Sequence, residues 1–209
     1  MNHELQELLK RSSDRHSHLC PRQVLGVRIG LAGMAALGLE APISKQSGLV
    51  IVETDGCFVD GIEVATGATV GHRTLRLGDY GKIAATFVSA TSGQAVRLWP
   101  RTGAREKAAR YAPDAPDPYE AQVTGYQHMP EAELFHQECV VLTRSVEALI
   151  SQPEIRVHCD ACGEEIFNER QVIVGDGILC RPCAAGGYYL PAVQDLPRPA
   201  RGVEIPAYG

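Results

Sequence analysis

Two pairs of cysteines near the C-terminal end place the strongest constraint on how this chain can fold. Cys159 and Cys162 are separated by two residues, and after seventeen further residues Cys180 and Cys183 repeat the same spacing. This spacing is typical of sites in which four thiolates hold one zinc ion. We therefore predict a structural zinc site, because four protein ligands leave no open coordination position for a substrate.

Two alternatives stay open at this point. Four thiolates also suit an iron–sulfur cluster, and two CxxC pairs can be buried or redox-active cysteines without any ion. The segment from Arg170 to Leu179 predicts two strands that turn at 175–177, so that an ion would close a hairpin. So short a segment cannot bury enough apolar surface alone, and zinc would supply about 10 kcal/mol or more of folding free energy. We expect a small zinc-ribbon or treble-clef-like module.

The composition is that of a globular protein with one main core. The chain has 209 residues, of which 44% are hydrophobic and 22% charged, which allows one core-forming domain and a small satellite. We predict a core domain over 1–152, a four-cysteine zinc-binding module over 153–190 and a Pro-rich C-terminal tail over 191–209.

Charge and cysteine usage narrow the function classes. The formal net charge is -5, so the chain as a whole lacks the basic field that phosphate contact needs, and nucleic-acid binding is not expected. No apolar run reaches membrane-spanning length, so no membrane association is expected either. Paired CxxC spacings among seven cysteines favour metal binding in a reducing compartment, which predicts a cytoplasmic protein.

Hydrophobic periodicity and turn residues predict a mixed core. Helices are expected over 3–14, 22–39, 57–66, 117–127 and 130–137, with a short helical run that ends before Pro113. Strands are expected over 49–54, 82–89, 94–99 and 139–142. Strands and helices that are not strictly alternating favour the α+β class.

The predicted helix over 22–39 has one face made of glycines. Gly26, Gly30 and Gly33 recur at helical spacing, and each costs about 1 kcal/mol relative to alanine inside a helix. A neighbouring helix or strand should therefore approach this face closely. The same small residues would also permit close contact in a homodimer.

A second set of metal-ligating residues lies in the core. Cys20 and Cys57 both stand at predicted helix starts, where the helix dipole favours a thiolate. Together with His16 and His18 they form a candidate second metal site with an open position, and Cys57, His18 and Asp60 are the candidate catalytic residues. In the alternative interpretation Cys57 is a small buried side chain, the histidines are ordinary loop residues, and Cys139 belongs to the core.

Several runs resemble the FmdE family, which takes its name from formylmethanofuran dehydrogenase. The resemblance rests on residues 16–21, 52–60, 64–71 and 79–87, and it covers 16–99 well and 100–150 loosely. It implies an α+β core, an intertwined homodimer and a metal-binding cleft near His18, Cys20 and Cys57. A four-cysteine zinc module after the core is also a known arrangement in this family.

The chain departs from the family pattern at three positions. Arg22 stands where glycine is usual, Glu63 where glutamine is frequent, and Ala68 where cysteine is frequent. The ligand set of the core is therefore expected to be smaller than in relatives. The resemblance does not imply formylmethanofuran dehydrogenase activity, because many members occur without that enzyme.

Three functions compete on these observations. The first is a zinc-binding accessory protein that handles a metal, a cofactor or a partner molybdenum or tungsten enzyme. The second is a metal- or thiol-dependent enzyme acting on a small molecule in the His/Cys cleft, and the third is a regulator that uses its four-cysteine module for contacts. Whether the chain is an enzyme is left open by the sequence.

Overall fold

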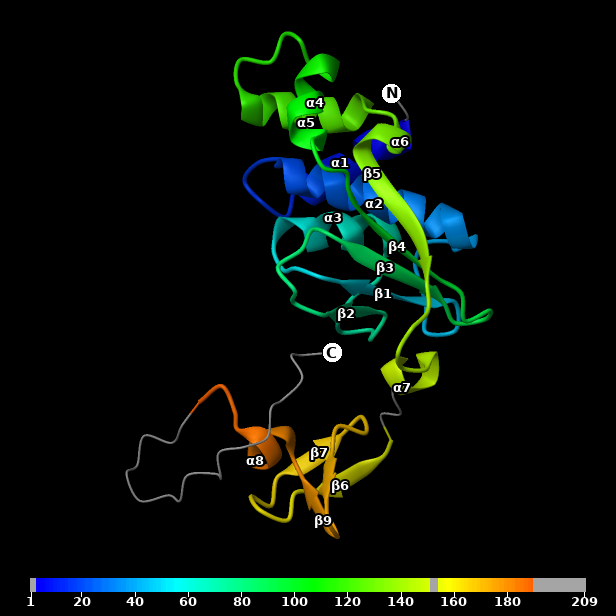
Figure 1. Cartoon of the computed structure of the whole chain (residues 1–209), viewed down its shortest axis with the longest axis vertical. Coiled ribbons are helices and arrows are strands. Elements are labelled where there is room, and N and C mark those ends of the chain that lie inside the picture. Colours follow the sequence, from blue (N-terminus) through cyan, green and yellow to red (C-terminus); the bar gives the residue numbers. More distant parts are fainter. Residues whose placement is uncertain (1–2, 151–153, 190–209) are drawn as a thin grey trace. The chain divides into compact units, whose positions relative to one another are not determined.

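The computed structural model describes residues 3–150 and 154–189, which fall into two compact units. The first unit ends at Val146 and the second begins at Glu147. The predicted boundary at 152 and the predicted tail over 191–209 lie outside the described residues. Figure 1 shows the elements of each unit.

A five-stranded sheet organises the first unit, in the order β2-β1-β3-β4-β5. Its strands are β1 (Gly48–Val52), β2 (Leu75–Leu77), β3 (Ala85–Ser89), β4 (Ala95–Pro100) and β5 (Phe135–Val140). Only the β1–β2 pair is parallel, and the other neighbours are antiparallel. The predicted hairpin is formed by β3 and β4, which confirms the turn at Ser92-Gly93.

Helices cover one face of this sheet. They are α1 (His3–Ser13), α2 (Pro21–Leu37), α3 (Cys57–Thr66), α4 (Ala104–Ala108), α5 (Pro118–His128), α6 (Glu131–Leu134) and α7 (Val146–Ile150), with a 3-10 turn at Ala109–Tyr111. The pair α2 and α3 lies against the sheet, and α1 and α5 pack against α2 (Figure 1). The mixture of one largely antiparallel sheet and segregated helices is the predicted α+β class.

The glycine face of α2 is used inside the chain. A methyl group at Gly26 would overlap the Phe58 carbonyl oxygen, one at Gly30 would lie 2.6 Å from the Ala65 side chain, and one at Gly33 would overlap the Phe87 ring. The predicted close approach is therefore confirmed, with α3 and β3 as the neighbours. It also removes the glycines as an argument for a homodimer, because their surface is already covered.

A buried arginine joins α2 to the end of α5. The Arg28 guanidinium donates to the backbone carbonyls of Tyr126 at 2.7 Å, Gln127 at 3.3 Å and Met129 at 3.0 Å. Burial lowers the pKa of Arg28, although the group remains a cation at any ordinary pH. The last carbonyls of α5, which have no partner within the helix, thus receive a charged donor from another element.

Two expectations about this unit are wrong. The predicted helix over 130–137 ends at Leu134, and β5 begins at the next residue because the segment pairs with β4. Cys139 therefore lies in the outer strand of the sheet and is exposed, not part of the core. The short strand β2 was not predicted.

The second unit contains the predicted hairpin and two further short strands. Its elements are β6 (Arg156–His158), β7 (Glu165–Phe167), β8 (Val172–Val174), β9 (Gly177–Leu179) and α8 (Arg181–Ala185). Strand β6 pairs with β7, and β8 pairs with β9 across the turn at 175–176. Of the helices that the structure describes, none combines the length and apolar composition that a membrane crossing requires.

Candidate functional site

The four cysteines of the second unit converge on one point. One Sγ atom from each of Cys159, Cys162, Cys180 and Cys183 lies within 4.8 Å of the others, and the Cys162–Cys180 sulfur distance is 3.9 Å. A tetrahedral ion with zinc–sulfur bonds of roughly 2.3 Å would place its sulfurs about 3.8 Å apart. The donor set and its spacing therefore fit a zinc ion with four thiolate ligands.

Two elements bring these sulfurs together. Cys159 follows β6, and Cys180 caps α8, whose first turn carries Cys183. The Asp160 backbone N–H donates to the Ile178 carbonyl at 2.8 Å, and the Ile178 N–H donates to Asp160 Oδ2 at 2.6 Å. These bonds tie the first CxxC loop to β9.

Backbone groups prepare one thiolate in advance. The Cys180 N–H donates to Cys159 Sγ at 3.2 Å, and this bond lowers the pKa of Cys159 to about 6. By contrast, hydrogen bonding to the Cys180 side chain raises the pKa of Cys183. A positive ion is thus needed before all four sulfurs can be thiolates at neutral pH.

In the first unit the predicted pair of cysteines does come together. Cys20 caps α2 and Cys57 is the first residue of α3, and these two helices pack along their length. Gln23 fixes the position of Cys20, because its Oε1 accepts from the Cys20 N–H at 2.8 Å and its Nε2 donates to the Ser12 carbonyl at 2.7 Å. Gln23 is fully buried, so this support is held firmly.

Cys20 differs from the expectation in its acidity. Burial raises the pKa of the Cys20 thiol, and a hydrogen bond and charge interaction with Cys57 raise it further, against the backbone N–H of Gln23, which lowers it. Burial thus outweighs the helix end at Cys20. We refer to Cys20 and Cys57 below as the thiol pair.

Tyr119 is the third member of this region, and it was not among the residues predicted from the sequence. Burial raises its pKa, and interactions with Cys20 and Cys57 raise it further, which places its ring beside the thiol pair. Tyr119 belongs to α5, about a hundred residues after Cys20. A single tyrosine in an unremarkable helix gives no sequence signal for such a position.

The predicted histidines are held in different ways. His16 Nε2 lies 2.6 Å from Asp60 Oδ2, which supports the expectation that Asp60 orients a histidine. Arg15 joins the same contact, with Nη1 2.5 Å from Glu63 and 3.7 Å from Asp60. His18 Nδ1 lies 3.2 Å from Ser17 Oγ.

The core residues do not form a closed ligand cluster. Over 3–150 and 154–189, only the four C-terminal cysteines bring three or more ligand atoms within 4.8 Å of one another. The thiol pair therefore supplies two ligands, and His16 is engaged by Asp60. A shared site of Cys20, Cys57 and a histidine stays a prediction.

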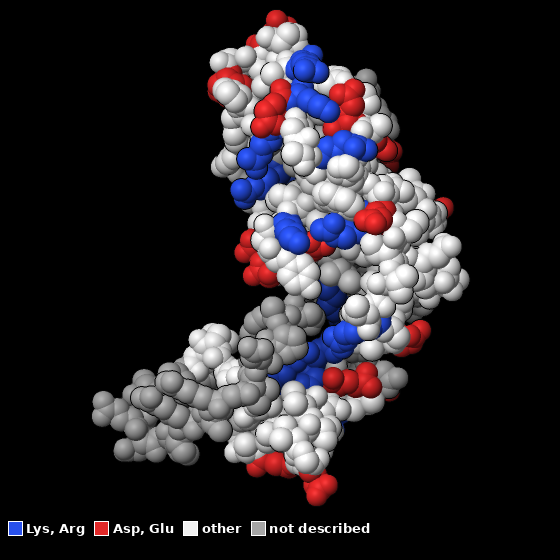
Figure 2. All heavy atoms as spheres, viewed as in Figure 1, with Lys and Arg blue, Asp and Glu red and all other residues white. Residues whose placement is uncertain are grey.

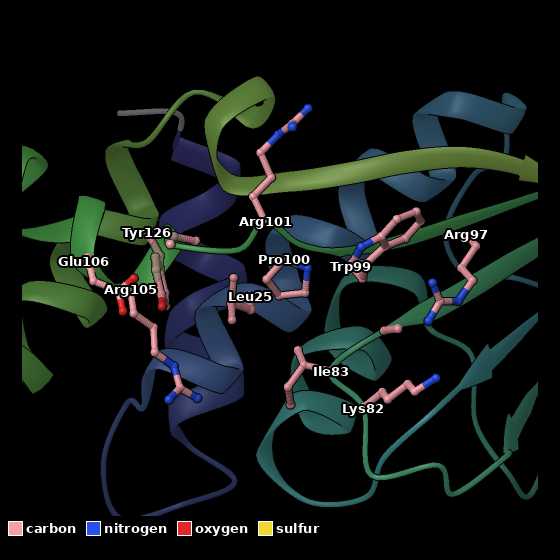
Figure 3. A pocket seen from close by; sticks show the side chains of 13 residues that line it. Leu25, Lys82, Ile83, Arg97, Trp99, Pro100, Arg101, Arg105, Glu106 and Tyr126 are labelled. Carbon is pink, nitrogen blue, oxygen red and sulfur yellow. The ribbon is translucent and has the colours of Figure 1, made fainter.

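A pocket of about 420 Å³ lies further along the first unit. Its lining includes Leu25 of α2, Trp99 of β4 and Tyr126 of α5, together with several cationic side chains (Figure 3). Leu25 follows Cys20 by five residues on α2, a rise of about 7.5 Å along the helix axis. No motif in the sequence marks this pocket, because its residues come from separate segments.

Comparison with known proteins assigns both units. Residues 15–136 match the model of the family described as "FmdE, Molybdenum formylmethanofuran dehydrogenase operon". Residues 154–189 match the "Prokaryotic dksA/traR C4-type zinc finger". The second match favours zinc over an iron–sulfur cluster at the four cysteines.

Two individual proteins are similar over most of the chain. A "Probable S-adenosyl-L-methionine-binding protein" of Archaeoglobus fulgidus is 32% identical over 214 aligned positions, which cover 89% of this chain and 54% of that protein. The chain thus spans about half the length of this curated relative.

The second is the crystal structure of an FmdE-like protein of tungsten formylmethanofuran dehydrogenase from Syntrophus aciditrophicus. It superimposes with a TM-score of 0.56 at 19% identity, covering 89% of this chain and 95% of that one, which shows a shared fold. Since the family model matches more than half of the sequence, the chain belongs to the FmdE family and carries a four-cysteine zinc-finger module after the FmdE core.

Proposed function

We propose that this protein is an accessory protein that carries a soft metal ion, or a cofactor containing one, on the thiol pair and passes it to a partner enzyme. The single observation that supports this most directly is the contact between Cys20 and Cys57 at the starts of two packed helices. Thiolates are the ligands that soft metals prefer. The four-cysteine module has a separate, structural role in this proposal.

A two-thiolate site suits transfer better than permanent storage. Two protein ligands leave coordination positions open, so that a cargo can keep some of its own ligands and can later be taken by a site with more donors. The family description, which names the molybdenum formylmethanofuran dehydrogenase operon, makes a molybdenum or tungsten enzyme the first partner to consider. This partner, like a cytoplasmic location, is part of the proposal.

Cadmium titration tests the metal-carrying step. Cadmium has no redox chemistry under these conditions and reports thiolate binding by ultraviolet charge-transfer absorption. We expect the wild type to bind two ions per chain, Cys57→Ser and Cys20→Ser to bind one, and Cys162→Ser to lose the other one. Equal binding by wild type and Cys57→Ser would contradict the proposal.

A thiol-dependent enzyme is the second candidate, and the position of Tyr119 favours it. A phenol beside Cys57 could exchange a proton with the thiol or with a bound small molecule. In that case Cys57 should react with iodoacetamide faster than the exposed Cys139, which serves as an accessible reference thiol. A slower reaction at Cys57 would count against a nucleophilic role and leave the carrier proposal intact.

We also propose a homodimer, as the family resemblance implies. The outer strand β5 supports this, because three of its six residues are exposed and it can accept a neighbouring strand. Sedimentation equilibrium at micromolar concentration should give twice the chain mass of 22.6 kDa. A mass of one chain would refute the dimer.

A further inference from the structure

The pocket beside α2 has more positive charge than the chain around it. Four cationic side chains and one carboxylate line it: Lys82, Arg97, Arg101, Arg105 and Glu106. The chain as a whole is acidic, with a formal net charge of -5. On the face of the molecule shown in Figure 2, Lys and Arg are interspersed with Asp and Glu over the first unit. A local excess of cations in a concave site therefore needs an explanation.

Only one of these cations is neutralised by a carboxylate. Arg97 donates to both carboxylate oxygens of Glu53, at 2.6 and 2.7 Å, and its guanidinium lies 4.7 Å from the centre of the Trp99 ring. Within the part of the chain that the structure describes, Lys82, Arg101 and Arg105 have no carboxylate within 4.0 Å of their charged nitrogens. Their charge is available to a ligand.

Arg101 provides an independent sign of a missing partner. Its Nε atom is buried and has no hydrogen-bond partner among the described residues. A buried donor on a charged group that is left unpaired is costly, and native structures satisfy nearly all such groups. An acidic oxygen bound in the pocket would supply the acceptor.

The three available cations come from three different segments. Lys82 precedes β3, Arg101 follows β4, and Arg105 lies in α4, so the charges surround the pocket and do not form a single cluster (Figure 3). Arg105 also interacts with the hydroxyl of Tyr126. A ligand that engages them all must carry more than one acidic group.

The remaining lining is apolar. Leu25, Ile83, Pro100 and Ala104 contribute aliphatic surface, and Tyr126 contributes its buried ring. Both faces of the Trp99 ring have neighbours, because Arg97 lies over it and the His136 ring is stacked 5.2 Å away. Trp99 therefore offers its edge and does not act as a stacking platform. The volume lies within the range of small-molecule sites, roughly 300–1,000 Å³.

We infer that this pocket binds a small organic polyanion, with an apolar body and two or more carboxylate or phosphate groups, through Lys82, Arg101 and Arg105. This site is separate from the thiol pair and does not depend on the metal-carrying proposal. Carboxylate and phosphate share the chemistry that guanidinium and ammonium groups recognise. Electrostatic attraction in a concave site also raises the local concentration of such ligands.

The chain contains its own reporter for this site. Trp99 is the single tryptophan of the sequence and lines the pocket, so its fluorescence responds to occupancy. The probes are pyrophosphate, citrate and adenosine 5′-diphosphate, with uncharged adenosine for comparison, all at matched ionic strength because salt screens these contacts. At least one polyanion should change the fluorescence at up to millimolar concentration and raise the melting temperature.

Neutral substitutions separate a built site from general charge attraction. Lys82→Gln and Arg101→Gln should each weaken binding of that probe about tenfold, because each removes one charge-assisted contact. Lys45→Gln, a change at an exposed lysine outside the pocket, should leave it unchanged. Without ligand all three variants should melt like the wild type, since neither Lys82 nor Arg101 has a side-chain ion pair to lose.

The outcomes discriminate clearly. A stronger response to pyrophosphate than to citrate identifies a phosphate ligand, and the reverse order identifies a carboxylate ligand. The inference is overturned if no polyanion changes Trp99 fluorescence. It is equally overturned if adenosine binds as well as its diphosphate, or if the pocket variants bind like Lys45→Gln.

Discussion

At the scale of single residues, the close approach of α2 and α3 depends on two glycines that face each other. A methyl group at Gly61 would overlap the Gln23 carbonyl oxygen and lie 2.8 Å from the Gly26 Cα atom. These are backbone contacts, which cannot move aside as a flexible side chain could.

Gly61→Ala should therefore destabilise the protein by about 1–3 kcal/mol, although alanine is the better helix former. Gly71→Ala is the matched control, because Gly71 lies in an exposed turn with nothing within 4 Å of the added methyl group. It should stay within about 0.5 kcal/mol of the wild type in urea unfolding. Equal stability of the two variants would show that α2 and α3 can move apart at little cost.

Residues differ in how far the sequence could place them. The CxxC spacing predicts all four zinc ligands, because the ligands are short-range pairs with a known separation. The approach of Cys20 to Cys57 rests on two helix starts and a family resemblance, and their packing through small residues brings them together. Tyr119 could not be predicted, since only the tertiary fold brings α5 to the thiol pair.

At the scale of elements, Arg28 is the main polar link between α2 and α5. Arg28→Met keeps much of the apolar stem but removes the donors to three carbonyls, so it should cost about 2 kcal/mol or more. Arg22→Met, at an exposed position on the same helix, should have little effect. Hydrogen exchange should show the loss at the end of α5 in the first variant only.

The elements that sequence patterns missed are those decided by pairing. Strand β2 has three residues and is held by parallel pairing with β1, which no local pattern records. The segment from Phe135 to Val140 contains His, Gln and Glu and has only partial burial, yet it forms a strand because β4 offers a free edge. Partner strands override local preference in sheets.

At the scale of the whole molecule, the two units should lose their structure separately when zinc is removed. Cys162→Ser takes away one of four ligands, so the second unit loses the coordination energy that a core of its size cannot replace. Elemental analysis should show the loss of one zinc per chain, and hydrogen exchange should speed up over 156–185 while α2 and β3 remain protected.

Cys139→Ser is the control for this experiment, because Cys139 is exposed and lies outside the four-cysteine cluster. It should retain zinc and its exchange pattern. If Cys162→Ser also lost protection in α2, the two units would be parts of one cooperative structure. If wild-type protein contained iron and no zinc, the structural zinc site itself would be wrong.

The path of the chain between β4 and β5 has an evolutionary consequence. These strands are antiparallel neighbours, so a short hairpin would suffice to join them, but residues 101–134 leave the sheet to form α4, α5 and α6 before returning. This excursion carries Arg101, Arg105 and Tyr126 into the pocket and Tyr119 to the thiol pair. Descendants of one ancestor can thus exchange or reshape the excursion, and with it the bound molecule, while inheriting the sheet and the α2–α3 pair unchanged.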